Sequence, residues 1–297
     1  TGHNGFKGSW LLFWLNELGA YTYGVSDLRK HQNSFHSSKI SDHSNSFYFN
    51  ICNYSKTEKL IKNIKPDIIF HLAAQPYVLS SFENPYYTFY NNFLSTLNIL
   101  DIYKNIKFKS KLLVVTSDKV YENNNKNRPF KEIDRLGGID PYSSSKSICE
   151  NMFNSYNKTF LSIKRNKGVA SVRAGNVIGG GDWGNNRIIP DFIKSIVNKK
   201  KLLIRSPNSI RPWQYILDCL AGYLLIGQNL LEGSTSINNS WNLGPKNSSN
   251  ITVEELVNKC QKIWKNGNIE IRQLNKYRES KYLKLDISKS KKSLGWK

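Results

Sequence analysis

Short apolar runs alternate with amphipathic segments along the first half of the chain. The apolar runs are typical of buried strands in a parallel sheet. They lie at residues 21–26, 47–52, 67–75 and 112–117. The amphipathic segments have a helical period. They are a helix that ends at Gly19 and residues 55–65, 81–105 and 143–160. Because strand and helix alternate repeatedly, the pattern predicts an α/β fold with a doubly wound parallel Rossmann sheet.

The second half of the chain continues this pattern less regularly. Residues 168–183 predict another buried strand that ends in a glycine-rich loop, and residues 241–245 predict a last strand of the main sheet. The shorter helices and strands around them predict a smaller α/β cap that binds the substrate. We therefore expect a main domain at 1–172 plus about 213–243, and a cap at about 173–212 plus 244–297.

Three glycines open the chain in the pattern G-x-x-G-x-x-G, at Gly2, Gly5 and Gly8, and lead directly into the first helix. Glycine permits a tight turn and a close backbone approach, and the N–H groups of a helix N-terminus attract anions. The pattern therefore predicts a phosphate cradle, although a glycine-rich helix start can also be only a turn.

The residues after the strand at 21–26 indicate which dinucleotide this cradle holds. Asp27 is placed to hydrogen-bond an adenosine ribose. Arg29 and Lys30 follow it, and basic residues there could instead meet a 2′-phosphate.

A second group of polar residues combines a hydroxyl, a phenol, ammonium groups and a carboxyl. Tyr142 and Lys146 form Y-x-x-x-K, which puts both side chains on one helix face, where the ammonium can lower the pKa of the phenol. Ser117, Asp118 and Lys119 follow the apolar strand at the edge where open parallel sheets place their chemistry. Tyr142 is thus a candidate proton acceptor, unless the Y-x-x-x-K spacing arose by chance in a lysine-rich chain.

Composition narrows the function classes. At 297 residues the chain exceeds the size at which one core usually stops growing, so a large domain with an appendage is expected. The cysteines at 52, 149, 219 and 260 are far apart, which argues against a zinc site or a disulfide framework. No apolar run approaches the roughly 18 residues of a membrane span, and no leader is visible. We expect a cytoplasmic protein with no membrane partner.

The formal charge of +21 could indicate nucleic-acid binding, an anionic substrate, or only a lysine-rich sequence. The lysines are scattered and no nucleic-acid motif accompanies them, so nucleic-acid binding is not expected. His31, His36 and His43 lack metal-ligand spacing and predict a surface loop, and no metal is expected. His71, within the apolar run at 67–75, is expected to be packed rather than catalytic.

Seven motifs spread over essentially the whole chain resemble the extended short-chain dehydrogenase/reductases of the NAD-dependent epimerase/dehydratase family, and within it the CDP-glucose 4,6-dehydratases. They are TGHNGFKGSW, KPDIIFHLAAQP, TSDKVY, LGGIDPYSSSK, VRAGNVIGGGDW, IRPWQ and YLKLDISKSKKSLGW. Lys119 directly after Asp118 separates the chain from the dTDP-glucose dehydratases, where a glutamate would be expected.

This resemblance implies a reaction in which bound NAD takes a hydride from C4 of the sugar, water leaves across C5 and C6, and the hydride returns to C6. It implies that Tyr142 is the base for the C4 hydroxyl, that Lys146 lowers its pKa and holds the nicotinamide ribose, and that Ser117 hydrogen-bonds the same oxygen. Asp118 would protonate the departing C6 hydroxyl, and Lys119 would act at C5. The product would be CDP-4-keto-6-deoxyglucose.

The resemblance also implies which residues bind the two ligands. The expected NAD-binding residues are Gly2, Gly5, Phe6, Lys7, Gly8, Asp27, Asn50, Ile51, Leu72, Ala73, Ala74, Gln75, Asn92, Tyr142 and Lys146. The expected nucleotide-sugar-binding residues are Gln75, Asn176, Arg187, Arg205, Arg211, Trp213 and Gln214. From the residues alone, Arg205, Arg211 and Trp213 could hold a diphosphate or could be surface salt-bridge residues. Family members usually form homo-oligomers through helices around 85–104 and 142–160.

Some features depart from the family pattern or leave alternatives open. Asn50 stands where an acid often contacts adenine, and Ser95 where another small residue is expected. A first strand before the glycine cradle is absent, so the chain resembles a fragment whose sheet we expect to be poorly protected from hydrogen exchange.

The alternatives to a dehydratase are a related epimerase or reductase, and a basic NAD-binding protein without turnover.

Overall fold

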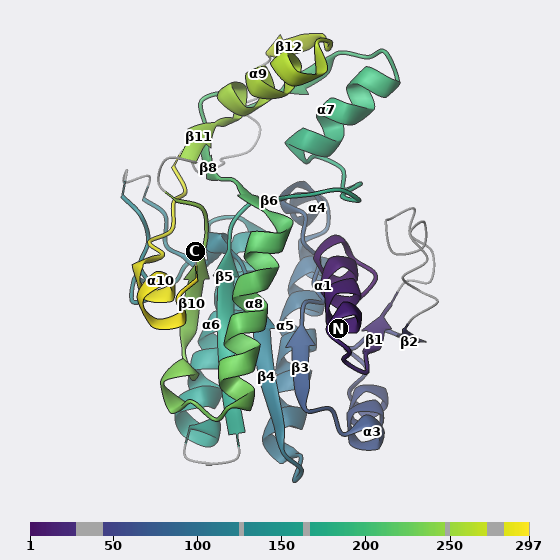
Figure 1. Ribbon diagram of the computed structural model, residues 1–297, viewed down its shortest axis with the longest axis vertical. Helices are drawn as coiled ribbons and strands as arrows, with labels where there is room; N and C mark the ends of the chain where they lie inside the picture. The colour runs from purple at the N-terminus through teal and green to yellow at the C-terminus, as the bar shows by residue number, and fades with distance from the viewer. Residues whose placement is uncertain (28–43, 125–127, 163–166, 247–249, 272–281, 297) are drawn as a thin grey trace.

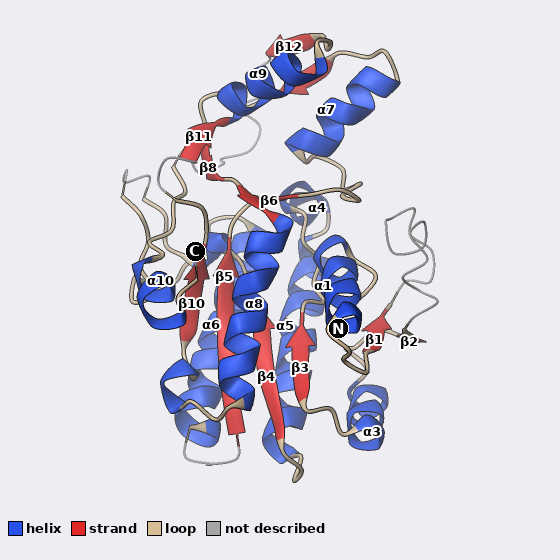
Figure 2. Cartoon of the chain, viewed as in Figure 1, coloured by secondary structure: helices blue, strands red, loops and turns tan. Residues whose placement is uncertain are grey.

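The computed structural model describes residues 1–27, 44–124, 128–162, 167–246, 250–271 and 282–296. A parallel sheet with helices on both faces forms the body of the protein, and a smaller group of helices and strands lies over the ends to which the strand arrows point (Figures 1 and 2). No helix in the described part of the chain has both the length and the apolar composition needed to cross a bilayer.

The central sheet has four parallel strands in the order β10-β5-β4-β3. They are β3 (Ile68–His71), β4 (Ser110–Val115), β5 (Lys167–Ala174) and β10 (Ser240–Leu243). A separate parallel pair holds β1 (Tyr23–Ser26) and β2 (Asn45–Tyr48). The α/β class and the parallel sheet are thus confirmed, and WNLGP does supply the last strand.

Thr1 and Gly2 lie between these two groups of strands. The Thr1 nitrogen donates to the Phe70 carbonyl at 2.7 Å, and the Leu72 N–H donates to the Thr1 carbonyl at 3.2 Å. The Gly2 N–H donates to the Val25 carbonyl of β1 at 2.8 Å. The first residues of the chain therefore hydrogen-bond to both β1 and β3 and bring their carboxyl ends to one edge.

Alternate residues of the central strands face two separate apolar cores. Leu113 and Val115 of β4 pack with α8 and α1 on one face, whereas Leu112 and Val114 pack with α5 and α6 on the other. The period of two along a strand explains why these strands are apolar throughout. The helices of these layers are α1 (Phe6–Glu17), α3 (Tyr54–Ile64), α4 (Val78–Glu83), α5 (Pro85–Asn105), α6 (Pro141–Tyr156) and α8 (Ile216–Leu231).

Two helices replace the single one that the pattern at 81–105 predicted. The chain breaks between α4 and α5 at Asn84, whose side chain accepts the Tyr87 N–H at 2.9 Å. Pro85 has no N–H to donate within a continuous helix and suits the first turn of a new one. The break turns α4 across the end of the sheet, beside the cap (Figure 1).

The cap has its own small core. Its apolar residues are Phe192, Leu202, Ile204 and Val257. Its elements are α7 (Ile188–Val197), β7 (Leu202–Ile204), β8 (Ile210–Pro212), β11 (Asn250–Thr252), α9 (Val253–Trp264) and β12 (Ile269–Ile271). Short strands β6 (Val177–Ile178) and β9 (Gln214–Tyr215) pair below it, where the chain enters and leaves the cap.

The C-terminal segment, residues 282–296, belongs to the main body and not to the cap. The sequence pattern predicted that all of 244–297 lies in the cap, but Leu283, Leu285 and Trp296 are buried in the core around α8 and β10. The Trp296 indole donates to the Asp218 carbonyl at 3.0 Å, and α10 (Ser288–Leu294) packs on β10. Apolar side chains of this size are more stable in the large core than on a small cap.

Candidate functional site

A cavity of about 840 Å³ opens where the strand ends meet the cap. Its walls come from the glycine turn, the residues after β1, β3, β4 and β5, the start of α6, and the cap-facing loops. This volume is toward the upper end of ligand pockets, which span roughly 300–1,000 Å³. The position matches the place where open parallel sheets bind ligands, outside the carboxyl ends of their strands.

The glycine turn has no room for side chains. Gly2 has φ +69°, and a Cβ there would lie 2.8 Å from the Ala73 nitrogen. A Cβ on Gly8 would lie 2.1 Å from the Gly2 carbonyl oxygen, so α1 packs directly on the turn. Gly5, the N-cap of α1, has no side chain to cover the helix N-terminus. This cradle fits the diphosphate of a dinucleotide, because the first N–H groups of a helix lack intrahelical partners and Gly5, Phe6, Lys7 and Gly8 at the start of α1 line the cavity.

Most residues expected to bind the dinucleotide line this cavity. They are Gly2, Gly5, Phe6, Lys7, Gly8, Asp27, Asn50, Ile51, Leu72, Ala73, Ala74, Gln75, Tyr142 and Lys146. Arg29 and Lys30, on which the 2′-phosphate alternative rests, lie outside the described residues, as do His31, His36 and His43.

Asn92 is the exception among the expected dinucleotide-binding residues. Its side chain is buried behind the cavity wall, where it accepts the Gln75 N–H at 2.7 Å and donates to the Gln75 carbonyl at 3.2 Å. It therefore supports the loop after β3 rather than facing a ligand. Gln75 itself is also tied down, since its amide nitrogen donates to the Tyr77 carbonyl at 3.0 Å and to Thr88 at 2.8 Å.

Tyr142 and Lys146 face the cavity from one side of α6, as their spacing predicted. Burial raises the pKa of Tyr142 to about 12, while a hydrogen bond with Ser117 and the charge of Arg187 lower it. Burial also lowers the pKa of Lys146.

Asp118 is a buried carboxyl with one unsatisfied oxygen. The Ser117 hydroxyl donates to Oδ1 at 3.1 Å, whereas Oδ2 has no hydrogen-bond partner in the described part of the chain. Burial raises the pKa of Asp118, although Lys119, Ser117 and Arg211 act to lower it. Such a group holds its proton more readily than an exposed aspartate, so the site contains a potential acid beside a potential base.

Lys119 completes this group at the end of β4. Its backbone N–H donates to the Ser117 hydroxyl oxygen at 3.2 Å, in the short 3₁₀ turn Asp118–Val120. Its side chain lines the same cavity as Asp118 and Tyr142. Because of this turn, the consecutive residues Ser117, Asp118 and Lys119 all line one cavity. In a continuing strand, neighbouring side chains would point to opposite faces of the sheet.

The cap side of the cavity is lined by arginines. Asn176, Arg187, Arg205, Arg211 and Trp213 all reach it, as expected for substrate-binding residues. Gln214 does not, because it is buried below the cavity, where its amide nitrogen donates to the Leu243 carbonyl at 3.3 Å. Arginine guanidinium groups recognise phosphate oxygens by paired hydrogen bonds, so this wall suits a second diphosphate.

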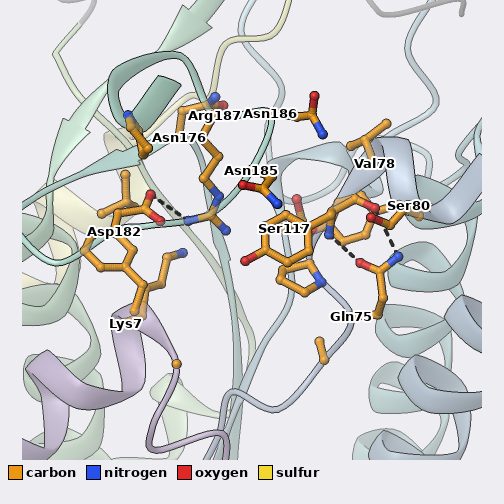
Figure 3. A pocket seen from close by; sticks show the side chains of 18 of the residues that line it. Lys7, Gln75, Val78, Ser80, Ser117, Asn176, Asp182, Asn185, Asn186 and Arg187 are labelled. Carbon is orange, nitrogen blue, oxygen red and sulfur yellow. Dashed lines mark hydrogen bonds and ion pairs between the residues drawn. The ribbon is translucent and has the colours of Figure 1, made fainter. Parts of the chain in front are cut away.

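Arg187 is held by residues that sequence reasoning missed. Its guanidinium pairs with Asp182 at 2.8 Å (Figure 3). It also lies over the Tyr77 ring, 5.2 Å from the centroid. The Tyr77 N–H donates to the Gln75 side-chain oxygen, which orients the loop. Asp182 and Arg187 are five residues apart in one glycine-rich loop, but the part of Tyr77 is not visible in the sequence.

A buried ion pair orients the helix that carries Tyr142 and Lys146. Glu150, one turn beyond Lys146 on the same face, accepts from Arg173 at 2.6 Å and from Thr116 at 2.6 Å. Neither charged side chain is more than 2% exposed. The contact joins α6 to β5 and to the end of β4, so it fixes which face of the helix turns toward the cavity.

The whole chain, residues 1–297, matches the family model described as GDP-mannose 4,6 dehydratase. It is 38% identical over 302 aligned residues to CDP-glucose 4,6-dehydratase of Salmonella typhimurium, covering 100% of this chain and 84% of that protein. It is 32% identical over 206 residues to dTDP-D-glucose 4,6-dehydratase of Dictyostelium discoideum, covering 66% of this chain and 45% of that protein.

Solved structures share the fold at lower identity. UDP-glucuronic acid 4-epimerase from Bacillus cereus, in complex with UDP-glucuronic acid and NAD, superposes with a TM-score of 0.85 at 23% identity, covering 100% of this chain and 92% of that chain. The dTDP-glucose 4,6-dehydratase from Bacillus anthracis, in complex with NAD, gives a TM-score of 0.83 at 22% identity, covering 100% and 89%.

Proposed function

The chain belongs to the GDP-mannose 4,6-dehydratase family of extended short-chain dehydrogenase/reductases, and from this membership we propose that it is an NAD-dependent CDP-glucose 4,6-dehydratase. The reaction would convert CDP-glucose to CDP-4-keto-6-deoxyglucose and water. The full-length similarity to the Salmonella enzyme supports this choice of nucleotide. We further infer a cytoplasmic enzyme of deoxysugar synthesis.

One observation carries the dehydratase assignment. The cavity places a buried carboxyl of raised pKa, Asp118, beside Lys119 and next to the Ser117, Tyr142 and Lys146 group. Hydride exchange at a hydroxyl needs only the last three residues, whereas loss of water also needs an acid for the departing hydroxyl. An epimerase or reductase would have no use for the pair Asp118 and Lys119, and a protein without turnover would not need the catalytic group.

The cavity fits NAD at the glycine cradle. Gly2, Gly5 and Gly8 would hold its diphosphate against α1, and Asp27 at the end of β1 would accept a hydrogen bond from its adenosine ribose. When bound, the cofactor supplies a hydride acceptor that later returns the same hydride.

The chain's own residues then divide the proton transfers. Tyr142, as phenolate, takes the proton of the sugar C4 hydroxyl, and Ser117 hydrogen-bonds the same oxygen while Lys146 holds its positive charge beside them. Once C4 is a ketone, the C5 hydrogen is acidic, and Lys119 either removes it as a neutral amine or stabilises the enolate as an ammonium. Asp118 gives its proton to the C6 oxygen, which leaves as water.

The direct test is mass spectrometry of products after parallel incubation with CDP-glucose, UDP-glucose and dTDP-glucose. We expect a product lighter by one water from CDP-glucose and at most slow turnover of the other two. An unchanged mass with a new sugar configuration would point to an epimerase. Turnover of dTDP-glucose in preference to CDP-glucose would contradict the proposed nucleotide.

The outer face of α5 supports a homo-oligomer. Tyr86, Tyr90 and Phe93 are exposed at helical spacing, and the rings of Tyr86 and Tyr90 stack with centroids 6.1 Å apart. Exposed aromatic side chains grouped on one helix face are typical of an interface. Light scattering should show a dimer or tetramer, and Phe93→Glu should shift it toward monomer.

A further inference from the structure

The backbone of Tyr142 is hydrogen-bonded to a neighbouring helix. The first N–H groups of a helix lack an intrahelical partner. In α6, Pro141 has no N–H to donate, and the Ser143 N–H donates to the Asp140 side chain at 2.9 Å. Between them stands the Tyr142 N–H, which donates to the Ser81 hydroxyl oxygen of α4 at 3.2 Å. At the start of α6, the residue proposed as the base is thus held by a side chain from another helix.

Ser81 is enclosed in the protein at this contact. It is the buried residue of α4, with 0% of its surface exposed. Its hydroxyl donates to the Val78 carbonyl at 2.6 Å, three residues back in the same helix. A serine hydroxyl has one proton to donate and two lone pairs that can accept. The bond to Val78 uses the proton and leaves the lone pairs of Oγ for the Tyr142 N–H.

The carbonyl of Tyr142 is held as well. The Ser145 hydroxyl donates to it at 2.7 Å, and the Asn92 side chain of α5 donates to the Ser145 hydroxyl oxygen at 2.9 Å. The two peptide groups that flank Tyr142 are therefore connected to α4 on one side and to α5 on the other. The Cα of Tyr142 lies between these groups, so the bonds fix the point from which the phenol projects.

The helix that carries Ser81 also forms part of the cavity wall. Val78, Leu79 and Ser80 line the cavity, and Figure 3 shows Val78 and Ser80 on the wall beside Gln75. Ser81 comes next in the chain, where α4 packs on α6. One short helix thus lines the space proposed for the ligands and hydrogen-bonds to the backbone of the proposed base.

We propose that Ser81 is a positioning residue for Tyr142, which places the phenol for proton transfer by holding the backbone N–H of the tyrosine against α4. The proposal rests on the proposed function of Tyr142 as the base. Because Ser81 is buried behind the cavity wall, it acts only through Tyr142. Loss of its oxygen would leave a buried N–H without its acceptor, and the first turn of α6 would shift to find another. A misplacement of about 1 Å can cost about 10²-fold in rate.

The test compares Ser81→Ala with the matched control Ser290→Ala. Ser290 of α10 is also 0% exposed and donates to the Asn242 carbonyl at 2.5 Å, so both variants lose one buried hydroxyl and its hydrogen bonding. Each NAD-loaded protein is mixed with saturating CDP-glucose in a single turnover, and reduction of the bound NAD is followed by absorbance. We expect Ser81→Ala to react about tenfold more slowly than the wild type, with NAD content and KM for CDP-glucose unchanged. Ser290→Ala should react at the normal rate.

A second pair of variants separates the hydrogen bond from packing. Ser81→Thr and Ser81→Val add nearly the same volume, but only threonine has a hydroxyl that can accept the Tyr142 N–H. Valine also fills the space in which a water could replace the lost oxygen. We expect Ser81→Thr to react faster than Ser81→Val. Normal reduction by Ser81→Ala, or equal slowing in the threonine and valine variants, overturns the proposal; if neither of these two folds, the alanine comparison decides.

A readout without turnover separates this proposal from the proposed function. In NAD-loaded protein carrying isotope-labelled tyrosine, the amide and ring resonances of Tyr142 are assigned with Tyr142→Phe. In Ser81→Ala we expect the Tyr142 amide proton to exchange faster with solvent and the ring resonance to move, whereas Ser290→Ala should leave both unchanged.

An unmoved ring resonance in Ser81→Ala, or a slower reaction that is accompanied by lost NAD and a raised KM, would mean that Ser81 only stabilises the fold, and would overturn its positioning role. Failure of the wild type to reduce its NAD with CDP-glucose would instead contradict the proposed function. The ring resonance would still decide whether Ser81 places Tyr142.

Discussion

Two walls of the cavity differ in how much of the protein packs behind them. The strand-edge wall is formed by Ser117, Asp118, Tyr142 and Lys146, and the cap wall by Arg187, Arg205 and Arg211. Ser117, Asp118, Tyr142 and Lys146 are each at most 8% exposed and lie between the two large cores of the sheet. On the cap wall Arg211 is also buried, but Arg187 and Arg205 are only half-buried, and the cap behind them has a core of four buried apolar side chains. In the proposed mechanism, the main body would therefore fix the geometry of the chemical step, whereas recognition of the nucleotide would depend on a smaller unit.

The sharpest way to test this contrast is on the strand-edge wall. Tyr142→Phe should reduce the rate of bound NAD reduction by about 10²–10⁴-fold, because only the proton acceptor is lost. NAD content after purification should stay normal, since the cradle and Lys146 are unchanged. Single-turnover absorbance measures the rate, and accumulation of a 4-keto sugar at the normal rate would remove Tyr142 from the mechanism.

Lys119→Met should separate the two halves of the reaction. C4 oxidation does not need Lys119, so bound NADH should build up after CDP-glucose is added, while product formation falls on the order of 10²-fold. Absorbance of the bound NADH and mass spectrometry follow the two steps. Normal exchange of the C5 hydrogen with deuterated solvent, together with normal product, would leave Asp118 or a water as the group acting at C5.

On the cap side, Phe192→Ala should destabilise the cap by about 3–5 kcal/mol through the cavity that it leaves. KM for the nucleotide sugar should rise while NAD binding is retained, because the core around Phe192 is separate from the cores of the sheet. Leu220→Ala in the large core is the matched control and should weaken both nucleotide-sugar binding and NAD binding. Calorimetry and NAD titration report the difference, and equal loss of both functions in the two variants would show that the cap is not a separate unit.

Asp118→Asn should make the protein more stable but inactive. The pKa of Asp118 is raised by folding, so the folded state binds its proton more tightly than the unfolded chain, and the wild type loses stability as pH rises above 3.8 toward the folded-state value. The variant lacks this loss, so it should be more stable than the wild type at neutral pH and no more stable below pH 3.8. Urea unfolding at both pH values measures the difference, and a variant less stable than the wild type at neutral pH would contradict the prediction.

Local spacing was enough to predict the strand-edge wall. The glycine turn, the end of β4 and the first turn of α6 each have a periodic or motif signal, and strand ends of a parallel sheet meet at one edge. Ser117, Asp118, Lys119, Tyr142 and Lys146 could therefore be grouped from the sequence alone. The direction of the Tyr142 pKa could not, because it depends on burial by residues that are distant in the sequence.

A few other features of the site and the fold could not be predicted for the same reason. Tyr77 meets Arg187 across the cavity, and Asn92 and Gln214 turn away from it, although their places in the motifs suggested contact with ligands. The C-terminal residues were expected in the cap because they follow its helix in the chain. Packing decides which way a side chain points and which of two cores an apolar segment joins. Sequence patterns do not contain this information.

The ion pair between Glu150 and Arg173 limits how this protein can evolve. Replacing one member would leave a buried charge without its partner, a change that costs about 3–5 kcal/mol, whereas replacing both with apolar side chains of similar volume can be neutral. The two positions should therefore show strong epistasis, with each single change deleterious and the double change tolerated. Because Glu150 shares a helix face with Tyr142 and Lys146, the orientation of this proposed catalytic pair is inherited together with that distant arginine.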